Sequence, residues 1–263
     1  MLGAAVTALA GHAVPAVSAV APLRRRLWPD LSGTGRPDHV ALTFDDGPDR
    51  RSTPRMLRAL AEADVRATFF LLGAMLDHDH ALGREIVAAG HEVAVHGWAH
   101  RNLLGRSPWG TYTDIARAHD LVSRVTGTEP RWYRPPYGVL TGAALVACRR
   151  LGLRPRLWTA WGRDWTAEAT PASVYREVTG DLTGGGTVLL HDADGTGAPG
   201  AWQATLGALP LLVAWARERG LTVGPLGSHR AGSPPAPPPG RRWRPPARPR
   251  AFPDRGRSRA GTG

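Results

Sequence analysis

Short apolar runs alternate with longer amphipathic segments from residue 39 to residue 224. His39–Phe44 and Ala67–Leu72 have the composition of strands, and the second is a continuous apolar run apart from Thr68, as in a strand covered on both faces. Between them, Thr53 and Pro54 place a capping residue and a proline where a helix near 53–63 would begin. This alternation predicts a parallel sheet with helices outside, either as a barrel or as an open doubly wound sheet.

The remaining elements follow from the same pattern. We expect strands at 91–96, 132–134, 156–160, 187–191 and 221–223, and helices near 81–89, 112–126, 140–151, from 170 onwards and at about 200–219. No glycine-rich phosphate loop follows the first strand. Asp45-Asp46-Gly47-Pro48 stands there instead, which argues against a nucleotide-binding fold.

The formal charge of +11 is unevenly distributed. From residue 229 to the C-terminus there are nine arginines and one acid, which leaves 24 cationic and 21 acidic residues in the rest of the chain. The Pro/Arg-rich segment 229–263 cannot build a core, and we expect it to be disordered or polyproline-like. It suits an anionic polymer or a membrane surface, with a merely solvated tail as the alternative, and no specific nucleic acid is expected.

The N-terminal segment is apolar from residue 2 to 22, is interrupted by His12 and Pro15, and is followed by three arginines, Arg24–Arg26. A secretory signal carries its charge before the apolar run, and a spanning helix needs about 20 strongly apolar residues. Three interpretations stay open: a helix packed on the domain, a membrane-associated anchor, or a signal that starts upstream. We therefore divide the chain into this segment with its linker (1–37), a folded domain (38–228) and the tail (229–263).

Polar side chains cluster at the carboxyl ends of the expected strands. These are Asp45 and Asp46, His96, Arg134, Asp164 (a few residues past its strand) and His191. In parallel α/β folds, active sites assemble at this end of the sheet. Two adjacent carboxylates at the end of a buried strand repel each other unless a cation, an arginine or a shared proton offsets the repulsion. The alternative is a solvated Asp-Asp-Gly turn.

His96 and His100 are four residues apart, so both rings can face one point. Two histidines and one carboxylate are a usual ligand set for a catalytic divalent metal with open positions, and Asp46 can supply the carboxylate. A pair of surface or core histidines is the alternative.

Five motifs occur together in this chain. They are Thr43-Phe44-Asp45-Asp46-Gly47-Pro48, His96-x-x-x-His100, Arg134-Pro135-Pro136-Tyr137-Gly138, Asp164-Trp165 and Leu189-Leu190-His191-Asp192. In order and spacing they resemble the polysaccharide deacetylases (carbohydrate esterase family 4, the NodB-homology domain) over roughly residues 38–226. The resemblance implies a distorted, incomplete (β/α) barrel of the polysaccharide deacetylase type. It also implies a metal-dependent hydrolase that removes N-acetyl groups from an amino-sugar polymer or oligosaccharide, chitooligosaccharide or peptidoglycan-like. The rivals are hydrolysis of another linear amide on the same site and a catalytically weak carbohydrate-binding module.

The resemblance further implies a role for each metal-facing residue. Asp46, His96 and His100 look like the ligands of one divalent ion, zinc first, with cobalt, manganese or nickel as alternatives. Such an ion polarises the amide carbonyl and activates water. Asp45 looks like the general base that takes the water's proton, and Arg134 resembles the residue that pairs with it.

Other residues look like the parts of the site that handle the leaving group and the acetyl group. His191 resembles the general acid that protonates the leaving amine, with Asp164 as its orienting and pKa-raising partner. The Tyr137 backbone N–H is placed to face the developing oxyanion. Leu189 would line the acetyl pocket and Trp165 would form its wall.

Two positions depart from the family pattern. Gly97 follows the first histidine, where the family usually has Ser or Thr, and a lost hydrogen bond of that kind costs about 10–100-fold in metal affinity. Trp161 stands where many members carry an earlier Asp of the fourth motif. We therefore expect a weaker metal site or a shifted substrate. A cell-envelope location follows from the resemblance, although the N-terminus gives no convincing signal peptide.

Overall fold

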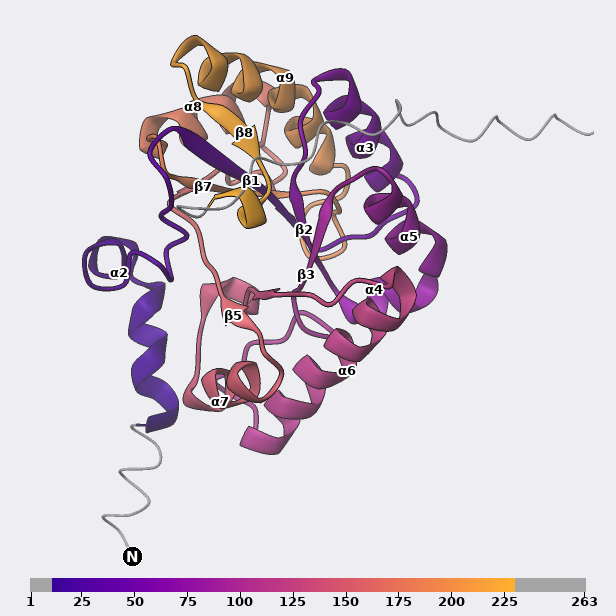
Figure 1. Ribbon diagram of the computed structural model, residues 1–263, viewed down its shortest axis with the longest axis vertical. Coiled ribbons are helices and arrows are strands. Elements are labelled where there is room, and N and C mark those ends of the chain that lie inside the picture. The colour runs from indigo at the N-terminus through magenta and orange to yellow at the C-terminus, as the bar shows by residue number, and fades with distance from the viewer. Residues whose placement is uncertain (1–10, 230–263) are drawn as a thin grey trace, which may run out of the picture.

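The computed structural model describes residues 11–229, and in that part of the chain eight parallel strands form one sheet (Figure 1). The strand order is β5-β4-β3-β2-β1-β7-β6, and β8 pairs with β1. The strands are β1 (His39–Asp45), β2 (Thr68–Leu71), β3 (Glu92–Val95), β4 (Trp132–Tyr133), β5 (Arg154–Pro155), β6 (Ala160–Trp161), β7 (Thr187–His191) and β8 (Thr222–Gly224).

The central strand is β1, whose seven residues are all buried. It pairs with β2 on one side and with β7 on the other. The register sets Asp45 level with Phe70 of β2 and with His191 of β7. The carboxyl ends of these strands therefore meet at one edge of the sheet, as parallel pairing requires.

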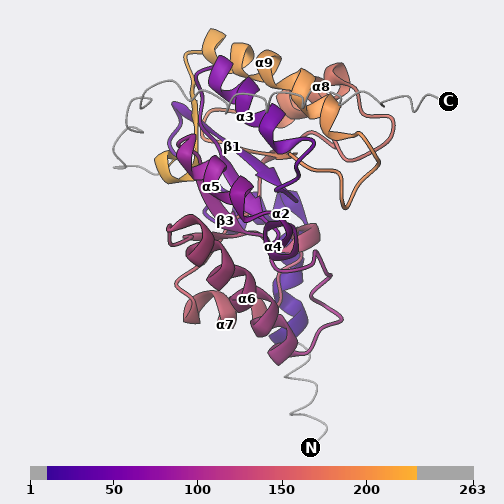
Figure 2. The same ribbon diagram turned by 90° about the vertical axis from the view of Figure 1, so that its right-hand side faces the viewer.

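Helices cover the outside of the sheet. They are α2 (Ala21–Leu27), α3 (Thr53–Glu62), α4 (Gly73–His78), α5 (His80–Ala88), α6 (Pro108–Thr126), α7 (Gly142–Arg150), α8 (Pro171–Asp181) and α9 (Trp202–Glu218), with 3-10 turns η1 (Val14–Ala19), η2 (Pro136–Gly138) and η3 (Leu226–Ser228). Figures 1 and 2 show α3, α8 and α9 at one end of the molecule and α6 and α7 at the other. One apolar cluster lies under the first group and also takes in Leu121, Val122 and Val125 of α6. A second cluster lies under α6 and α7. The predicted incomplete barrel is confirmed: the sheet curls into a half-barrel with helices around it.

The strand predicted at 156–160 is wrong. Instead, β5 pairs with β4 at one edge of the sheet and β6 pairs with β7 at the other. Residues 156–159, which we call the crossing segment, run between these two edges. Leu157 and Trp158 make the segment resemble a strand, and Leu157 is fully buried, although residues 156–159 do not form one.

Helix α4 was not predicted. It begins at Gly73, a residue of low helix propensity. Its start is fixed by tertiary contacts, because the N–H groups of Gly73 and Ala74 donate to the carbonyls of Gly97 and Trp98, each at 2.9 Å. No local sequence signal reports such contacts.

Residues of the expected linker are hydrogen-bonded to the domain. Leu31 accepts a hydrogen bond from the Leu157 N–H (2.8 Å), and the carbonyl of Gly33 accepts one from Thr187 Oγ1 (2.6 Å). At the other boundary, His229 is buried, and its Nε2 donates to the carbonyls of Gly33 and Gly185. In α2, Arg24 is buried and donates to the carbonyl of Trp158 at 2.8 Å, which is a contact expected of a helix packed on the domain.

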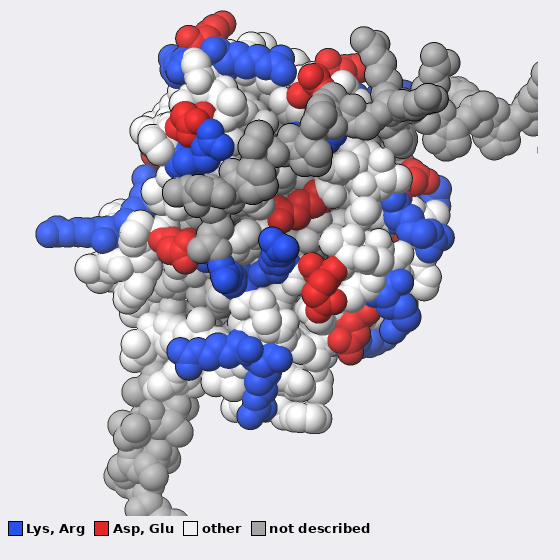
Figure 3. Space-filling model, viewed as in Figure 1, with Lys and Arg blue, Asp and Glu red and all other residues white. Residues whose placement is uncertain are grey.

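The anchor and tail predictions fall mostly on residues 1–10 and 230–263, which lie outside the described residues. Among residues 11–229, no helix combines the length and apolarity needed to cross a membrane. On the face shown in Figure 3, arginines and acids are interspersed, as expected from the near balance of charge outside the tail.

Candidate active site

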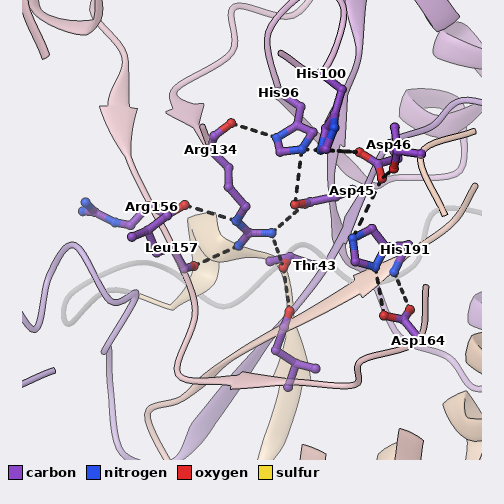
Figure 4. A network of polar contacts seen from close by, with 12 residues as sticks. Thr43, Asp45, Asp46, His96, His100, Arg134, Arg156, Leu157, Asp164 and His191 are labelled. Carbon is purple, nitrogen blue, oxygen red and sulfur yellow. Dashed lines mark hydrogen bonds and ion pairs between the residues drawn. The ribbon is translucent and has the colours of Figure 1, made fainter. Parts of the chain in front are cut away.

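A cavity of about 270 Å³ lies at the carboxyl edge of the sheet. Its lining residues are Asp45, Asp46, His96, His100, Pro135, Tyr137, Gly138, Trp158, Trp161, Trp165, Leu189, His191 and Thr196. The structure thus brings the predicted site residues to one place. Figure 4 shows the predicted aspartates, histidines and arginine among them. Only Arg134 and Asp164 are absent from the lining, and both lie buried directly behind it, in contact with Asp45 and His191.

Asp46, His96 and His100 form the one cluster of described residues with the geometry of a metal site, with one ligand atom of each within 4.8 Å of the others. The Nε2 atoms of His96 and His100 lie 3.4 and 3.6 Å from Asp46 Oδ1. That oxygen is buried and has no hydrogen-bond partner among the described residues. Nδ1 of His96 donates to the carbonyl of Arg134 at 2.8 Å, which turns Nε2 toward Asp46. An unpaired carboxylate oxygen facing two imidazole nitrogens fits a divalent cation.

Protonation of the cluster supports the same conclusion. Burial raises the pKa of Asp46, but His96, His191 and His100 outweigh it and hold that pKa well below its usual range. Burial lowers the pKa of His100 to about 4, so this ring is neutral. Burial also lowers the pKa of His96, yet the carboxylates of Asp45 and Asp46 raise it overall. A cation would replace the proton that these carboxylates draw onto His96, so metal binding should weaken as the pH falls.

Asp45 is paired with a fully buried arginine. Nη1 of Arg134 donates to Asp45 Oδ1 at 2.6 Å and to Thr43 Oγ1 at 2.9 Å. The rest of the guanidinium donates to the carbonyls of Arg156 and Leu157 (Figure 4). Asp45 Oδ2 is 3.7 Å from His96 Nε2 and so remains beside the ligand cluster. Arg134 therefore balances the charge of Asp45 and occupies its Oδ1, which leaves Asp45 Oδ2 free to face the cavity.

His191 is held by Asp164 from behind. Its Nδ1 donates to Asp164 Oδ1 at 2.8 Å, while Asp164 Oδ2 accepts from the His191 N–H (2.7 Å) and from Thr205 Oγ1 (2.5 Å). Burial lowers the pKa of His191, but Asp164, reinforced by Asp46 and Asp45, outweighs it and raises that pKa to about 10. At neutral pH the ring is therefore protonated, and its Nε2–H can donate a proton within the cavity.

The walls of the cavity are aromatic. Trp158 stacks on Trp161 (centroids 5.9 Å apart, planes at 23°), and Trp161 lies 5.1 Å from Trp165. Tyr137, which is 60% exposed, packs edge-on against His100 at 4.6 Å. At Trp161, where many family members carry an Asp, this protein therefore has an apolar ring in the cavity wall. This difference is the one from which we expected a shifted substrate.

Sequence reasoning missed two functional positions, Trp158 and Thr196. Trp158 sat inside a run interpreted as a strand. Thr196 lies in a glycine-rich loop after β7, and its hydroxyl donates to Asp46 Oδ2. This bond occupies the second carboxylate oxygen and leaves Oδ1 for a cation. No local pattern marks such a threonine, because the contact spans 150 residues of sequence.

Gly97 is supported by a residue that the sequence analysis did not consider. Its φ of +85° is left-handed, and an added Cβ would lie 2.9 Å from Asp114 Oδ2. The same oxygen accepts from the Trp98 N–H at 2.8 Å. Together with the two bonds from α4, this contact orders the loop that carries His96 and His100. The support that a hydroxyl was expected to give comes from a carboxylate on α6.

Gly97→Ser is therefore expected to lower divalent-metal affinity by about 10–100-fold, because it perturbs the ligand loop. The resemblance alone would suggest the opposite effect for a restored hydroxyl. Competition with a chromophoric chelator measures the affinity. Gly105→Ser is the matched control, since nothing lies within 4 Å of a Cβ at that position. Binding by Gly97→Ser as tight as in the wild type would contradict the role given to Asp114.

Comparison with known proteins gives consistent matches. The polysaccharide deacetylase family model matches residues 32–155. A chitooligosaccharide deacetylase of Bradyrhizobium sp. (strain ANU 289) is 34% identical over 209 residues, covering 77% of this chain and 94% of that protein. A peptidoglycan-N-acetylglucosamine deacetylase of Listeria monocytogenes is 34% identical over 159 residues, covering 60% of this chain and 33% of that protein. The solved structure of the Bc1960 peptidoglycan N-acetylglucosamine deacetylase matches with a TM-score of 0.69 and 28% identity, over 75% of this chain and 91% of that one.

Proposed function

Because this chain belongs to the polysaccharide deacetylase family, we propose that it is a metal-dependent hydrolase that removes N-acetyl groups from amino-sugar chains, with chitooligosaccharide as the first candidate substrate. This choice of substrate is supported by sequence identity over a nearly full-length match, which is 34% to the chitooligosaccharide deacetylase relative and 28% to the Bc1960 peptidoglycan deacetylase. The observation that carries the proposal is the arginine-paired Asp45 beside the cluster of Asp46, His96 and His100.

The three clustered residues would hold one divalent ion, which when bound polarises the amide carbonyl and makes water nucleophilic near neutral pH. Two imidazoles and a carboxylate with open positions favour zinc, with cobalt, manganese and nickel as alternatives. Asp45 takes the proton of the attacking water through Oδ2, because Arg134 occupies Oδ1.

The opposite side of the cavity handles the leaving group. As the C–N bond breaks, His191 delivers its Nε2 proton to the amine nitrogen, and Asp164 stabilises the protonated ring beforehand. Tyr137, Leu189 and Trp165 line the cavity. The Tyr137 N–H would face the developing oxyanion, and Leu189 and Trp165 would enclose the acetyl methyl group. The products are acetate and a free sugar amine. We place this activity in the cell envelope on the strength of the family resemblance alone. An anionic partner for the arginine-rich tail is a separate proposal, and it rests only on the charge of that tail.

Acetate release from chitooligosaccharides and from peptidoglycan, measured in parallel after chelation and readdition of zinc, cobalt, manganese or nickel, tests the proposal. We expect metal-dependent release, faster from chitooligosaccharides. Release from peptidoglycan alone would reassign the substrate. Glycan binding without acetate release under every metal would make the protein a carbohydrate-binding module.

Asp164→Asn should shift the alkaline limb of the pH profile of kcat/KM to lower pH. Asp164 is the main group that raises the pKa of His191, so without its charge burial lowers that pKa and the ring loses its proton earlier as the pH rises. We expect a loss of about 100-fold at alkaline pH and a smaller loss near pH 6.

Thr205→Val is the control for this change, because it removes a hydrogen bond to the same carboxylate but leaves the charge in place. In Thr205→Val, the alkaline limb of the pH profile of kcat/KM should lie at the same pH as in the wild type. An alkaline limb that does not move in Asp164→Asn would exclude His191 as the proton donor.

A further inference from the structure

We propose that Arg24 is a positioning residue for Trp158, so that the N-terminal helix α2 holds one wall of the active-site cavity in place from behind. The inference deepens the proposed function and rests on it for its kinetic readout. Residues 14–31 precede the region matched by the family model, which begins at residue 32. α2 lies at the left of Figure 1. Arg24 is the buried residue of this helix, with 1% of its surface exposed.

The crossing segment is held by guanidinium groups along its whole length. Its four successive carbonyls all accept bonds from arginines. From inside the half-barrel, Arg134 binds the carbonyls of Arg156 (3.2 Å) and Leu157 (2.9 Å). From outside, Arg24 binds the carbonyl of Trp158 (2.8 Å), and Arg25 binds that of Thr159. The segment forms no strand, so its carbonyls have no neighbouring strand as hydrogen-bond donor. The arginine side chains supply those hydrogen bonds instead.

Arg24 is built to bridge two parts of the chain. One terminal nitrogen donates to the Trp158 carbonyl, and the other donates to the carbonyl of Ser18 at 2.7 Å. Its guanidinium carbon also lies 5.6 Å from the centre of the Trp158 ring, within the range of a cation–π contact. Burial lowers the pKa of Arg24 to about 10, which still leaves the group charged at neutral pH. A buried cation with both ends bonded fixes the backbone and the ring of Trp158 together.

Trp158 has little freedom in the cavity that it lines. A Cβ added at Gly138 would lie 2.8 Å from its ring, which shows how closely the ring packs on the turn that carries Tyr137. The ring of Trp158 also stacks on that of Trp161. A displaced Trp158 would therefore disturb the turn that carries Tyr137 and its stacking on Trp161. The cluster of Asp46, His96 and His100 would keep its geometry.

The test compares Arg24→Ala, Arg24→Lys and Arg26→Ala in the full-length chain. Arg26 is exposed in the same helix, so its replacement makes the same charge change without contact to Trp158. For Arg24→Ala we expect kcat/KM for chitooligosaccharide to fall about 10-fold, with metal affinity unchanged. Arg24→Lys keeps the charge but not the two-pronged donor, so it should recover only part of the loss. Arg26→Ala should match the wild type.

Hydrogen exchange at the Leu157 and Thr159 amides is the second readout. Both amides are bonded, and we expect faster exchange in Arg24→Ala, with β1 unaffected. If Arg24→Ala does not fold, the same two measurements on Arg24→Lys decide. Lower thermal stability with wild-type kcat/KM and wild-type exchange in the crossing segment would overturn the inference. If the wild type releases no acetate, the proposed function fails, and the exchange data still decide the role of Arg24.

Discussion

Asp45→Asn is expected to lower the rate of acetate release by about 1000-fold or more while one divalent ion still binds. The amide oxygen of Asn can accept the bond from Arg134, so the buried pair keeps its geometry. It cannot accept a proton from water, so the variant loses the group assigned as the general base. Initial rates of acetate release and the metal content of the same sample measure the two effects.

Asp38→Asn is a suitable control for that variant, since it makes the same change at an exposed acid just before β1. It should behave as the wild type. Near-normal turnover by Asp45→Asn would show that another group removes the proton, and the assignment of the base would then be wrong.

His100→Ala is expected to lose both the metal and the activity. The variant removes one of three ligands and leaves Asp46 and His96 to hold the ion, so affinity should fall by at least about 100-fold, more than the loss of an outer contact. The side chain is mostly buried but lies on a loop, so the sheet should be unaffected. Metal titration followed by calorimetry, with acetate release at each metal concentration, separates weak binding from slow chemistry.

His80→Ala controls for the loss of an exposed histidine elsewhere and should bind metal as the wild type does. The contrast between Asp45→Asn, which keeps the metal, and His100→Ala, which loses it, distinguishes a base from a ligand. Full metal affinity in His100→Ala would remove this residue from the ligand set.

The sequence predicted the elements that position the site because their signals are local. Asp45 and Asp46 end a fully buried strand, and His191 ends another, so parallel pairing alone brings them together. The Asp164–His191 contact could be anticipated only through the resemblance, since Asp164 lies past the end of its strand. The order of the five motifs predicted a polysaccharide deacetylase, and the matched family model and relative are polysaccharide deacetylases.

The failures have a common physical cause, which is that the missed features depend on contacts between distant segments. The crossing segment resembles a strand because it is buried, yet it bonds to arginines from two other parts of the chain. Asp114 supports Gly97 from a helix that follows it, and Thr196 reaches Asp46 from a loop with no pattern of its own. Side-chain bonds of this kind leave no periodicity in the sequence.

The N-terminal segment is the clearest case. From composition alone, an apolar run followed by Arg24–Arg26 suggested an anchor or a signal as readily as a packed helix. In the structure the three arginines differ: Arg24 is buried, Arg25 reaches the crossing segment, and Arg26 is exposed. The three arginines have different roles because they are buried to different extents. The sequence of three identical residues does not show which of them is buried.

Titration of the chelated protein with zinc, with acetate release from a chitooligosaccharide as the signal, addresses the metal cluster and the chemistry together. The rate should rise in proportion to added zinc and stop rising at one equivalent per chain, and the same titration of His100→Ala should stay near zero over that range. Full activity in the thoroughly chelated protein, or no activity at any zinc concentration, would contradict the assignment of Asp46, His96 and His100 as the ligands of a catalytic ion.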